Sequence, residues 1–187
     1  TLYWVEALDK GDPEVKAEFR DELFQLESSF TASPQSMAKT INRYGGVVWG
    51  SDEYALLYDN WWNTRNIKTY LINPSDIAQE PKIISDRNYQ DIYSDPGTPE
   101  TERNEFGRYV LKMDGNTIYM FGDGYTPEGQ FPFIDALNLK TLDQKRIYQS
   151  SYKDKAEELI AWIDNKKGTV LTRMESPTEY PNYYMRN

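Results

Sequence analysis

The stretch "EYALLYDNWWNTRNIKTYLINP" (53–74) decides the fold. Two apolar runs of strand length, "EYALLYDNW" and "IKTYLINP", flank a polar segment, a pattern typical of two strands joined by a short connection. Successive side chains on a strand point to opposite faces, so Trp61 and Trp62 cannot both be buried on a regular strand. We expect one of them to be exposed, or the strand to end there.

The same order of features recurs along the chain: an apolar strand that gains acidic residues, a polar loop, and a second strand with aromatic residues. The repeats begin about 50–60 residues apart, close to the period of propeller blades, and a loop of about 20 residues (86–107) accounts for most of the excess. The middle two repeats are each preceded and followed by one more strand, which gives four strands per unit. The repeats are Leu2–Leu26, Tyr54–Asn73, Thr117–Asn138 and Thr169–Asn187.

The predicted fold class is therefore all-β, a partial β-propeller of about four antiparallel four-stranded blades, some of them incomplete. The chain is interpreted as a fragment of a single propeller domain. Its first unit lacks a first strand and its last unit lacks a fourth. The units are expected at about 1–44, 45–87, 105–150 and 155–187.

One segment fits two structures. "YKDKAEELIAWIDNKKG" (152–168) has apolar residues at helical spacing, with Gly168 placed to follow a helix C-cap. The repeat instead predicts the first strand of the last unit there. We expect a strand over Leu159–Asp164, with room for a helical turn before it.

Composition excludes several classes of function. The 187 residues carry 21 Lys and Arg against 30 Asp and Glu, a net charge of -9, which argues against a nucleic-acid partner. No apolar run approaches a membrane span. The chain has no Cys and no His, so it can form no disulfide, no thiol nucleophile, no Cys/His metal site and no Ser-His-Asp triad. We expect no cofactor and no metal.

Several long segments of the sequence resemble those of a known family. They are "YWVEALDKGDP" (3–13), "WGSDEYALLYDNWWNTRNIKTYLINP" (49–74), "DRNYQDIYSDPGTP" (86–99) and "GDGYTPEGQFPFIDALNLKT" (122–141), and "ESPTEYPNYYMRN" (175–187) resembles the strand pair that follows. They are similar to the propeller domain of glutamyl-endopeptidase-like members of the prolyl oligopeptidase family.

The resemblance implies a two-domain serine peptidase, in which a β-propeller caps an α/β-hydrolase domain that holds the catalytic residues. This chain has no G-x-S-x-G nucleophile motif, so the hydrolase domain is absent from it and we expect it to be inactive alone. The implied partners are that hydrolase domain and a peptide substrate. A periplasmic or secreted location is our guess for the longer protein.

Two other functions stay open: a stand-alone propeller that binds glycans or proteins, and an acid/base hydrolase. Exposed blade edges also predict self-association. Four acidic residues near the ends of equivalent strands could serve a hydrolase, but acceptance of local hydrogen bonds is the plainer reading, and no residue is assigned as catalytic. "MDGN" (113–116) is interpreted as a hairpin turn and not as a calcium loop. The four acidic residues are Glu6, Asp59, Asp123 and Glu175.

The candidate substrate-binding residues are Arg65, Trp61 and Trp62. Tryptophan offers a large contact area, and arginine can bind a carboxylate through two hydrogen bonds, as a peptidase that selects an acidic side chain requires. The alternatives are packing between blade faces for the tryptophans and a solvated or ion-paired loop arginine for Arg65.

Overall fold

The computed structural model describes residues 1–164 and 167–186 as a chain of antiparallel strands, with one short 3-10 turn at Ile92–Ser94 (η1). Residues 165, 166 and 187, which belong to the last predicted unit (155–187), lie outside the described residues. The prediction of an all-β, partial propeller-like fold is confirmed, because consecutive strands form successive blade-like meanders. By their internal contacts the residues divide into two units, which we describe separately.

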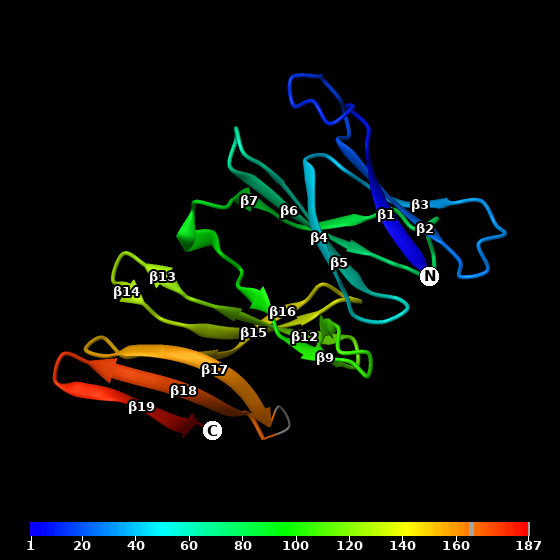
Figure 1. The fold of residues 1–187 in the computed structure, drawn as a ribbon. Coiled ribbons are helices and arrows are strands. Elements are labelled where there is room, and N and C mark those ends of the chain that lie inside the picture. Colours follow the sequence, from blue (N-terminus) through cyan, green and yellow to red (C-terminus); the bar gives the residue numbers. More distant parts are fainter. Residues whose placement is uncertain (165–166, 187) are drawn as a thin grey trace. The chain divides into compact units, whose positions relative to one another are not determined.

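Unit 1 (Thr1–Asp91 and Thr101–Leu111) holds two meander sheets and a small hairpin (Figure 1). In each meander the strands pair in chain order, so every connection joins antiparallel neighbours. The first sheet has three strands and the second has four. The strands are β1 (Leu2–Ala7), β2 (Asp21–Leu26) and β3 (Gln35–Thr40); β4 (Arg43–Trp49), β5 (Ala55–Trp61), β6 (Asn66–Ile72) and β7 (Lys82–Asn88); and β9 (Thr101–Arg103) with β10 (Tyr109–Leu111).

The core of unit 1 lies between its two meander sheets. Three consecutive residues of β5, Ala55, Leu56 and Leu57, have no exposed surface, so this strand is covered on both faces, as its uninterrupted apolar run predicts. β3 was not predicted, because Gln, Ser and Lys dilute its apolar signal, yet Met37 and Ala38 are buried in this core. The buried members are Leu23, Met37, Ala38, Ala55, Leu57, Tyr70 and Ile72.

Unit 2 (Ile92–Glu100 and Lys112–Asn187) holds one five-stranded sheet, one three-stranded sheet and a two-stranded arm that extends from the β12–β15 hairpin. The buried residues Tyr119, Ile134, Trp162 and Val170 join the two larger sheets. The strands are β8 (Thr98–Pro99), β11 (Met113–Asp114), β12 (Thr117–Gly122), β15 (Phe133–Asn138) and β16 (Gln144–Gln149); the arm β13 (Tyr125–Thr126) and β14 (Gly129–Gln130); and β17 (Ala156–Asp164), β18 (Thr169–Ser176) and β19 (Glu179–Arg186).

The ambiguous segment is a strand. β17 spans Ala156–Asp164 and pairs with β18, which confirms the predicted strand and excludes the helix over the part of 152–168 that the structure describes. Residues 151–155 form no helical turn. The apolar residues that mimic helical spacing are accommodated by two register shifts in β17, so pairing with β18 overrides the local helical pattern.

The prediction of a loop of about 20 residues (86–107) is wrong in part. β7 continues to Asn88, and both β8 and β9 fall within the predicted loop. β8 and β11 both pair with β12, so one edge of that sheet is made of two pieces separated by the β9–β10 hairpin. The main-chain N–H of Lys112 donates to the carbonyl of Glu100 (3.0 Å), which joins the two pieces at the base of the hairpin. The "MDGN" turn between β11 and β12 is confirmed, with Gly115 at a φ of 60°.

Within the described residues, no helix has the length and apolar character needed to cross a bilayer.

Candidate functional site

The connection between β5 and β6 carries the predicted binding residues. β5 ends at Trp61, and Trp62 begins a tight turn in which the N–H of Arg65 donates to the carbonyl of Trp62 (3.3 Å). Arg65 has a φ of 57°, in the left-handed region that costs a non-glycine residue about 1 kcal/mol. Trp61 is half-buried and Trp62 is 70% exposed. Both outcomes allowed by the alternation rule are therefore present: the strand ends, and one tryptophan is exposed.

Arg65 stacks on its exposed neighbour. Its guanidinium carbon lies 3.7 Å from the centre of the Trp62 ring, and Nη1 donates a hydrogen bond to the hydroxyl of Tyr89 (3.3 Å). Tyr89 is tied back in turn, because its N–H donates to the carbonyl of Arg65 (2.7 Å). In the part of the chain that the structure describes, no carboxylate lies within ion-pair distance of Arg65. The turn thus holds the Arg65 guanidinium in place, and no carboxylate among the described residues pairs with its charge.

Trp61 does not join this pair. Its ring is covered by a different arginine, Arg20, whose guanidinium carbon lies 4.0 Å from the ring centre. The structure therefore places Trp62 and Arg65 together and gives Trp61 a separate stacking partner from the loop between β1 and β2.

Three of the four strand-end carboxylates accept hydrogen bonds from neighbours, as the plainer reading expects. Glu6 accepts from the indole N–H of Trp4 (2.8 Å), and Glu175 accepts from Arg173 (2.7 Å). Asp59 has no exposed surface and accepts from Asn42, Lys68 and Tyr70. Burial, followed by the hydrogen bond to Asp59, raises the pKa of the Tyr70 hydroxyl, so this group stays protonated and donating.

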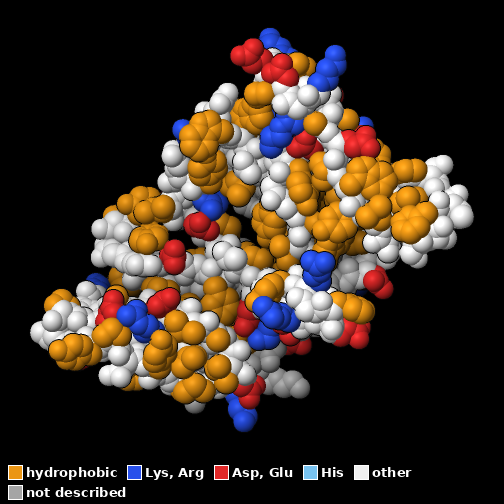
Figure 2. Space-filling model, viewed as in Figure 1, with side chains coloured by type: hydrophobic (Ala, Val, Ile, Leu, Met, Phe, Trp, Pro, Cys, Tyr) orange, Lys and Arg blue, Asp and Glu red, His pale blue; other side chains and the backbone are white. Residues whose placement is uncertain are grey.

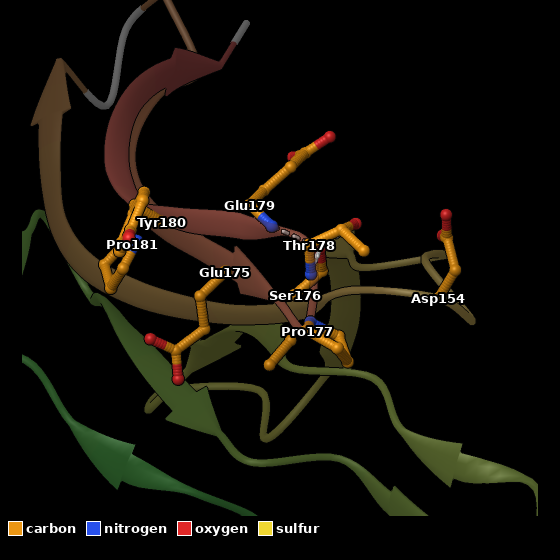
Figure 3. Close-up of a pocket in the computed structure, with 9 residues that line it drawn as sticks. Asp154, Glu175, Ser176, Pro177, Thr178, Glu179, Tyr180 and Pro181 are labelled. Carbon is orange, nitrogen blue, oxygen red and sulfur yellow. Dashed lines mark hydrogen bonds between the residues drawn. The ribbon is translucent and has the colours of Figure 1, made fainter.

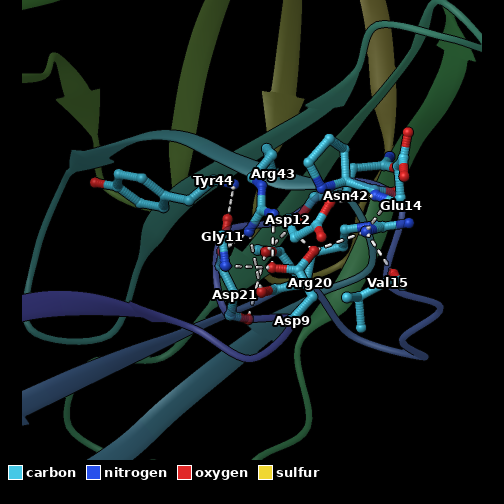
Figure 4. A network of polar contacts seen from close by, with 12 residues as sticks. Asp9, Gly11, Asp12, Glu14, Val15, Arg20, Asp21, Asn42, Arg43 and Tyr44 are labelled. Carbon is cyan, nitrogen blue, oxygen red and sulfur yellow. Dashed lines mark hydrogen bonds and ion pairs between the residues drawn. The ribbon is translucent and has the colours of Figure 1, made fainter.

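Sequence reasoning missed a second buried carboxylate, Asp9, because its two arginine partners lie 11 and 34 positions away along the chain. Figure 4 shows Asp9 enclosed by Arg20 and Arg43, with the N–H of Gly11 donating to it as well. Both oxygens of Asp9 lie 2.6 Å from Nη2 of Arg43, and one lies 2.7 Å from Nη1 of Arg20. The hydrogen bond from Arg43 is the largest of the effects that lower the Asp9 pKa, from 3.8 to about 2.

Acid is expected to weaken unit 1 through Asp9. Because the folded-state pKa lies below the unfolded-state value of 3.8, the stabilising contribution is present above that value and is lost as the pH falls toward about 2. Asp9→Asn should therefore lower the urea midpoint at neutral pH, and the gap from the parent chain should narrow across this window. Asp52→Asn, which alters an exposed aspartate, is the control. A gap that stays constant with pH would contradict the prediction.

A cavity with a volume of about 620 Å³ lies in unit 2 at the β18–β19 turn (Figure 3). Three carboxylates line it, and two of these already have partners: Glu175 pairs with Arg173 and Glu179 pairs with Lys155. Across the described residues no group of three or more acidic side chains is placed to hold a metal ion. The cavity is lined by Asp154, Ala156, Glu175, Ser176, Pro177, Thr178, Glu179, Tyr180 and Pro181.

The surface in Figure 2 mixes acidic and basic side chains, with hydrophobic ones exposed between them. Basic side chains form no continuous stripe on the face shown, as a groove that follows a phosphate backbone requires.

Comparison with known proteins associates this all-β chain with peptidases. It is similar to a segment of the probable chloroplastic glutamyl endopeptidase of Oryza sativa subsp. japonica, with 36% identity over 200 residues that cover 99% of this chain and 21% of that protein. The protein of the same name from Arabidopsis thaliana is 32% identical over 199 residues, which cover 98% of this chain and 21% of its own length. The chain thus spans about a fifth of the length of these curated relatives. No protein-family model and no solved structure matches it.

Proposed function

We propose that this chain is a noncatalytic propeller segment of a serine peptidase in the glutamyl endopeptidase-like branch of the prolyl oligopeptidase family. It caps the hydrolase active site, and it restricts and positions peptide substrates. The observation that carries the proposal is the similarity to two glutamyl endopeptidases over nearly the whole chain, combined with successive blade-like sheets. The absence of His and of a G-x-S-x-G motif supports a noncatalytic role for this segment.

A cap of this kind contributes to catalysis without supplying a reacting group. It excludes water and folded proteins from the site, and it holds the peptide in an orientation that favours attack. The partners that the proposal requires are the hydrolase domain of the longer protein and a peptide.

Within this function we assign Arg65 and Trp62 to the recognition of an acidic side chain. The half-buried Arg65 is held by Trp62 and Tyr89, and among the described residues no carboxylate of this chain lies within ion-pair distance of it. A cation that is already held in place loses less conformational freedom when it binds a carboxylate.

Arg65→Ala in a peptidase that contains this segment is expected to lower kcat/KM about tenfold on a substrate with glutamate at the recognised position. The reason is that a hydrogen bond to a charged group contributes about 1.5–3 kcal/mol and each 1.4 kcal/mol corresponds to a factor of ten. The same substitution should change kcat/KM for the substrate with glutamine at that position less than twofold, which corresponds to about 0.4 kcal/mol.

The matched control is Arg103→Ala, because Arg103 also stacks on an exposed ring, that of Tyr109, at 5.0 Å. It should leave the preference for glutamate unchanged. An equal loss on both substrates with Arg65→Ala would exclude Arg65 from recognition.

A further inference from the structure

We propose that Arg20, held by Asp9, is a positioning residue for the Trp62–Arg65 pair. The inference rests on the proposed function, because it concerns the same binding of an acidic side chain. It assigns a role to a loop arginine that stacks on Trp61 and pairs with Asp9.

Arg20 is held by the loop between β1 and β2. Its Nη1 donates to Asp9 (2.7 Å) and to the carbonyls of Pro13 (3.3 Å) and Val15 (3.1 Å), so three acceptors of the β1–β2 loop converge on one nitrogen. The side chain of Asp9 has no exposed surface, and that of Arg20 is only 14% exposed. A guanidinium with these contacts has one orientation.

Asp9 is anchored in turn to the two meander sheets of unit 1 through Arg43. Arg43, the first residue of β4, donates to Asp9 and also to Asp21, the first residue of β2, at 2.6 Å in each case. Asp21 in turn accepts from the N–H of Tyr44 (2.6 Å). Figure 4 shows that these contacts connect the loop to strands of both sheets of unit 1. Arg20 is therefore attached to a rigid base and not to a free loop.

Arg20 contacts the end of β5, which leads directly into the turn that holds Trp62 and Arg65. The planar guanidinium covers the ring of Trp61, the last residue of β5, and Trp62 follows directly. Because β5 ends at Trp61, the position of this residue sets where the turn that begins at Trp62 leaves the strand. Trp61 also faces Asn66 in the β5–β6 register, and Asn66 follows Arg65, so the stack fixes both ends of the turn.

Asn66 is itself held from the opposite side. Its Oδ1 accepts from Asn42 (2.8 Å), and its Nδ2 donates to Asp86 (2.7 Å). The turn is thus confined at one end by the stacking of Arg20 on Trp61 and at the other end by the hydrogen bonds of the Asn66 side chain. Trp62 is exposed at this turn, and the half-buried Arg65 stacks on it.

The decisive variant is Arg20→Lys. Lysine keeps the charge and can still pair with Asp9, but it lacks the flat surface that covers Trp61 and the fixed set of donors that reach the loop carbonyls. The matched control is Arg146→Lys in unit 2. Arg146 is likewise bound to a buried aspartate, Asp135, and likewise stacks on a ring, that of Phe133, at 3.8 Å.

The experiment titrates this 187-residue chain with acetyl-Ala-Glu-Ala-amide and with the glutamine peptide, following indole and backbone signals by NMR. The parent chain should bind the glutamate peptide more tightly. Arg20→Lys should weaken the binding of the glutamate peptide about fivefold and should change the affinity for the glutamine peptide less than twofold. It should also shift the Trp62 indole N–H signal, assigned with Trp62→Phe, in the free protein. Arg146→Lys should do neither.

The outcomes separate the two proposals. If Arg65→Ala removes the glutamate preference but Arg20→Lys retains both the preference and the Trp62 signal, the positioning role is wrong and the proposed recognition stands. If the parent chain shows no preference and Arg65→Ala changes nothing, the proposed recognition fails and the positioning role fails with it. Should Arg20→Lys not fold, Trp61→Phe, which keeps a smaller ring under Arg20, must produce the same selective weakening.

Discussion

Asp59→Ala is expected to lower the free energy of unfolding by about 4 kcal/mol, measured by urea denaturation followed through tryptophan fluorescence. Asp59 has no exposed surface and accepts four hydrogen bonds. Two come from Asn42, through its main-chain N–H and its Nδ2 (2.9 Å each). The others come from the N–H of Lys68 (3.2 Å) and the hydroxyl of Tyr70 (2.7 Å).

The magnitude follows from what the alanine leaves behind. Each buried donor that loses its acceptor costs about 1–3 kcal/mol, and relaxation or an entering water reduces the sum. Both Asn42 and Tyr70 are buried, at 8% and 3% exposure, so water cannot replace the carboxylate easily. Asp52→Ala, at an exposed aspartate, should change stability by less than about 0.5 kcal/mol. A loss below about 1 kcal/mol for Asp59→Ala would show that the network adds little to stability.

Gly124→Ala is expected to destabilise unit 2 by about 3 kcal/mol, because the new methyl group has no room and the backbone is left-handed. Gly124 has a φ of 65°, and a Cβ there would lie 1.8 Å from the carbonyl oxygen of Phe131. The N–H of Phe131 donates to the carbonyl of Gly124 (2.9 Å) and closes the base of the β13–β14 arm. The methyl group cannot be accommodated without breaking that base.

Gly115→Ala separates the steric conflict of the methyl group from the cost of the left-handed backbone. Gly115 is also left-handed, with a φ of 60°, but no atom lies within 4 Å of the position of its added Cβ. It should cost only the conformational penalty of about 1 kcal/mol. Denaturation midpoints measure both variants, and limited proteolysis should cut the arm only in Gly124→Ala. Equal losses for the two variants would show that steric conflict at Gly124 is relieved by a small shift.

The sequence could predict those parts of the fold that depend on local pattern. The alternation rule anticipated that Trp61 and Trp62 differ, and the repeat identified β17 as a strand against its helical spacing. β3 escaped detection because only Met37 and Ala38 among its residues are apolar and buried, and their burial depends on packing against the neighbouring sheet.

The candidate site was predictable in part for the same reason. Arg65 and Trp62 are close in sequence, and a turn brings them into contact. Arg20 and Trp61 are separated by 41 positions, and Asp9 and Arg43 by 34, so no spacing rule pairs them. These contacts exist because two sheets pack together, which is information that a linear pattern does not carry.

The divided edge of the β12 sheet has a consequence for how such a chain can change over time. Glu100 and Lys112 are joined by a main-chain hydrogen bond of 3.0 Å, so the two ends of the intervening segment are already adjacent. A segment with adjacent ends can lengthen, shorten or be exchanged with a small entropic cost, since loop closure depends only weakly on length. The turn of the β9–β10 hairpin, whose residues 105–108 are exposed, is therefore a natural graft point, where evolution or a protein engineer can exchange one peptide for another while the buried Leu111 of β10 stays in place.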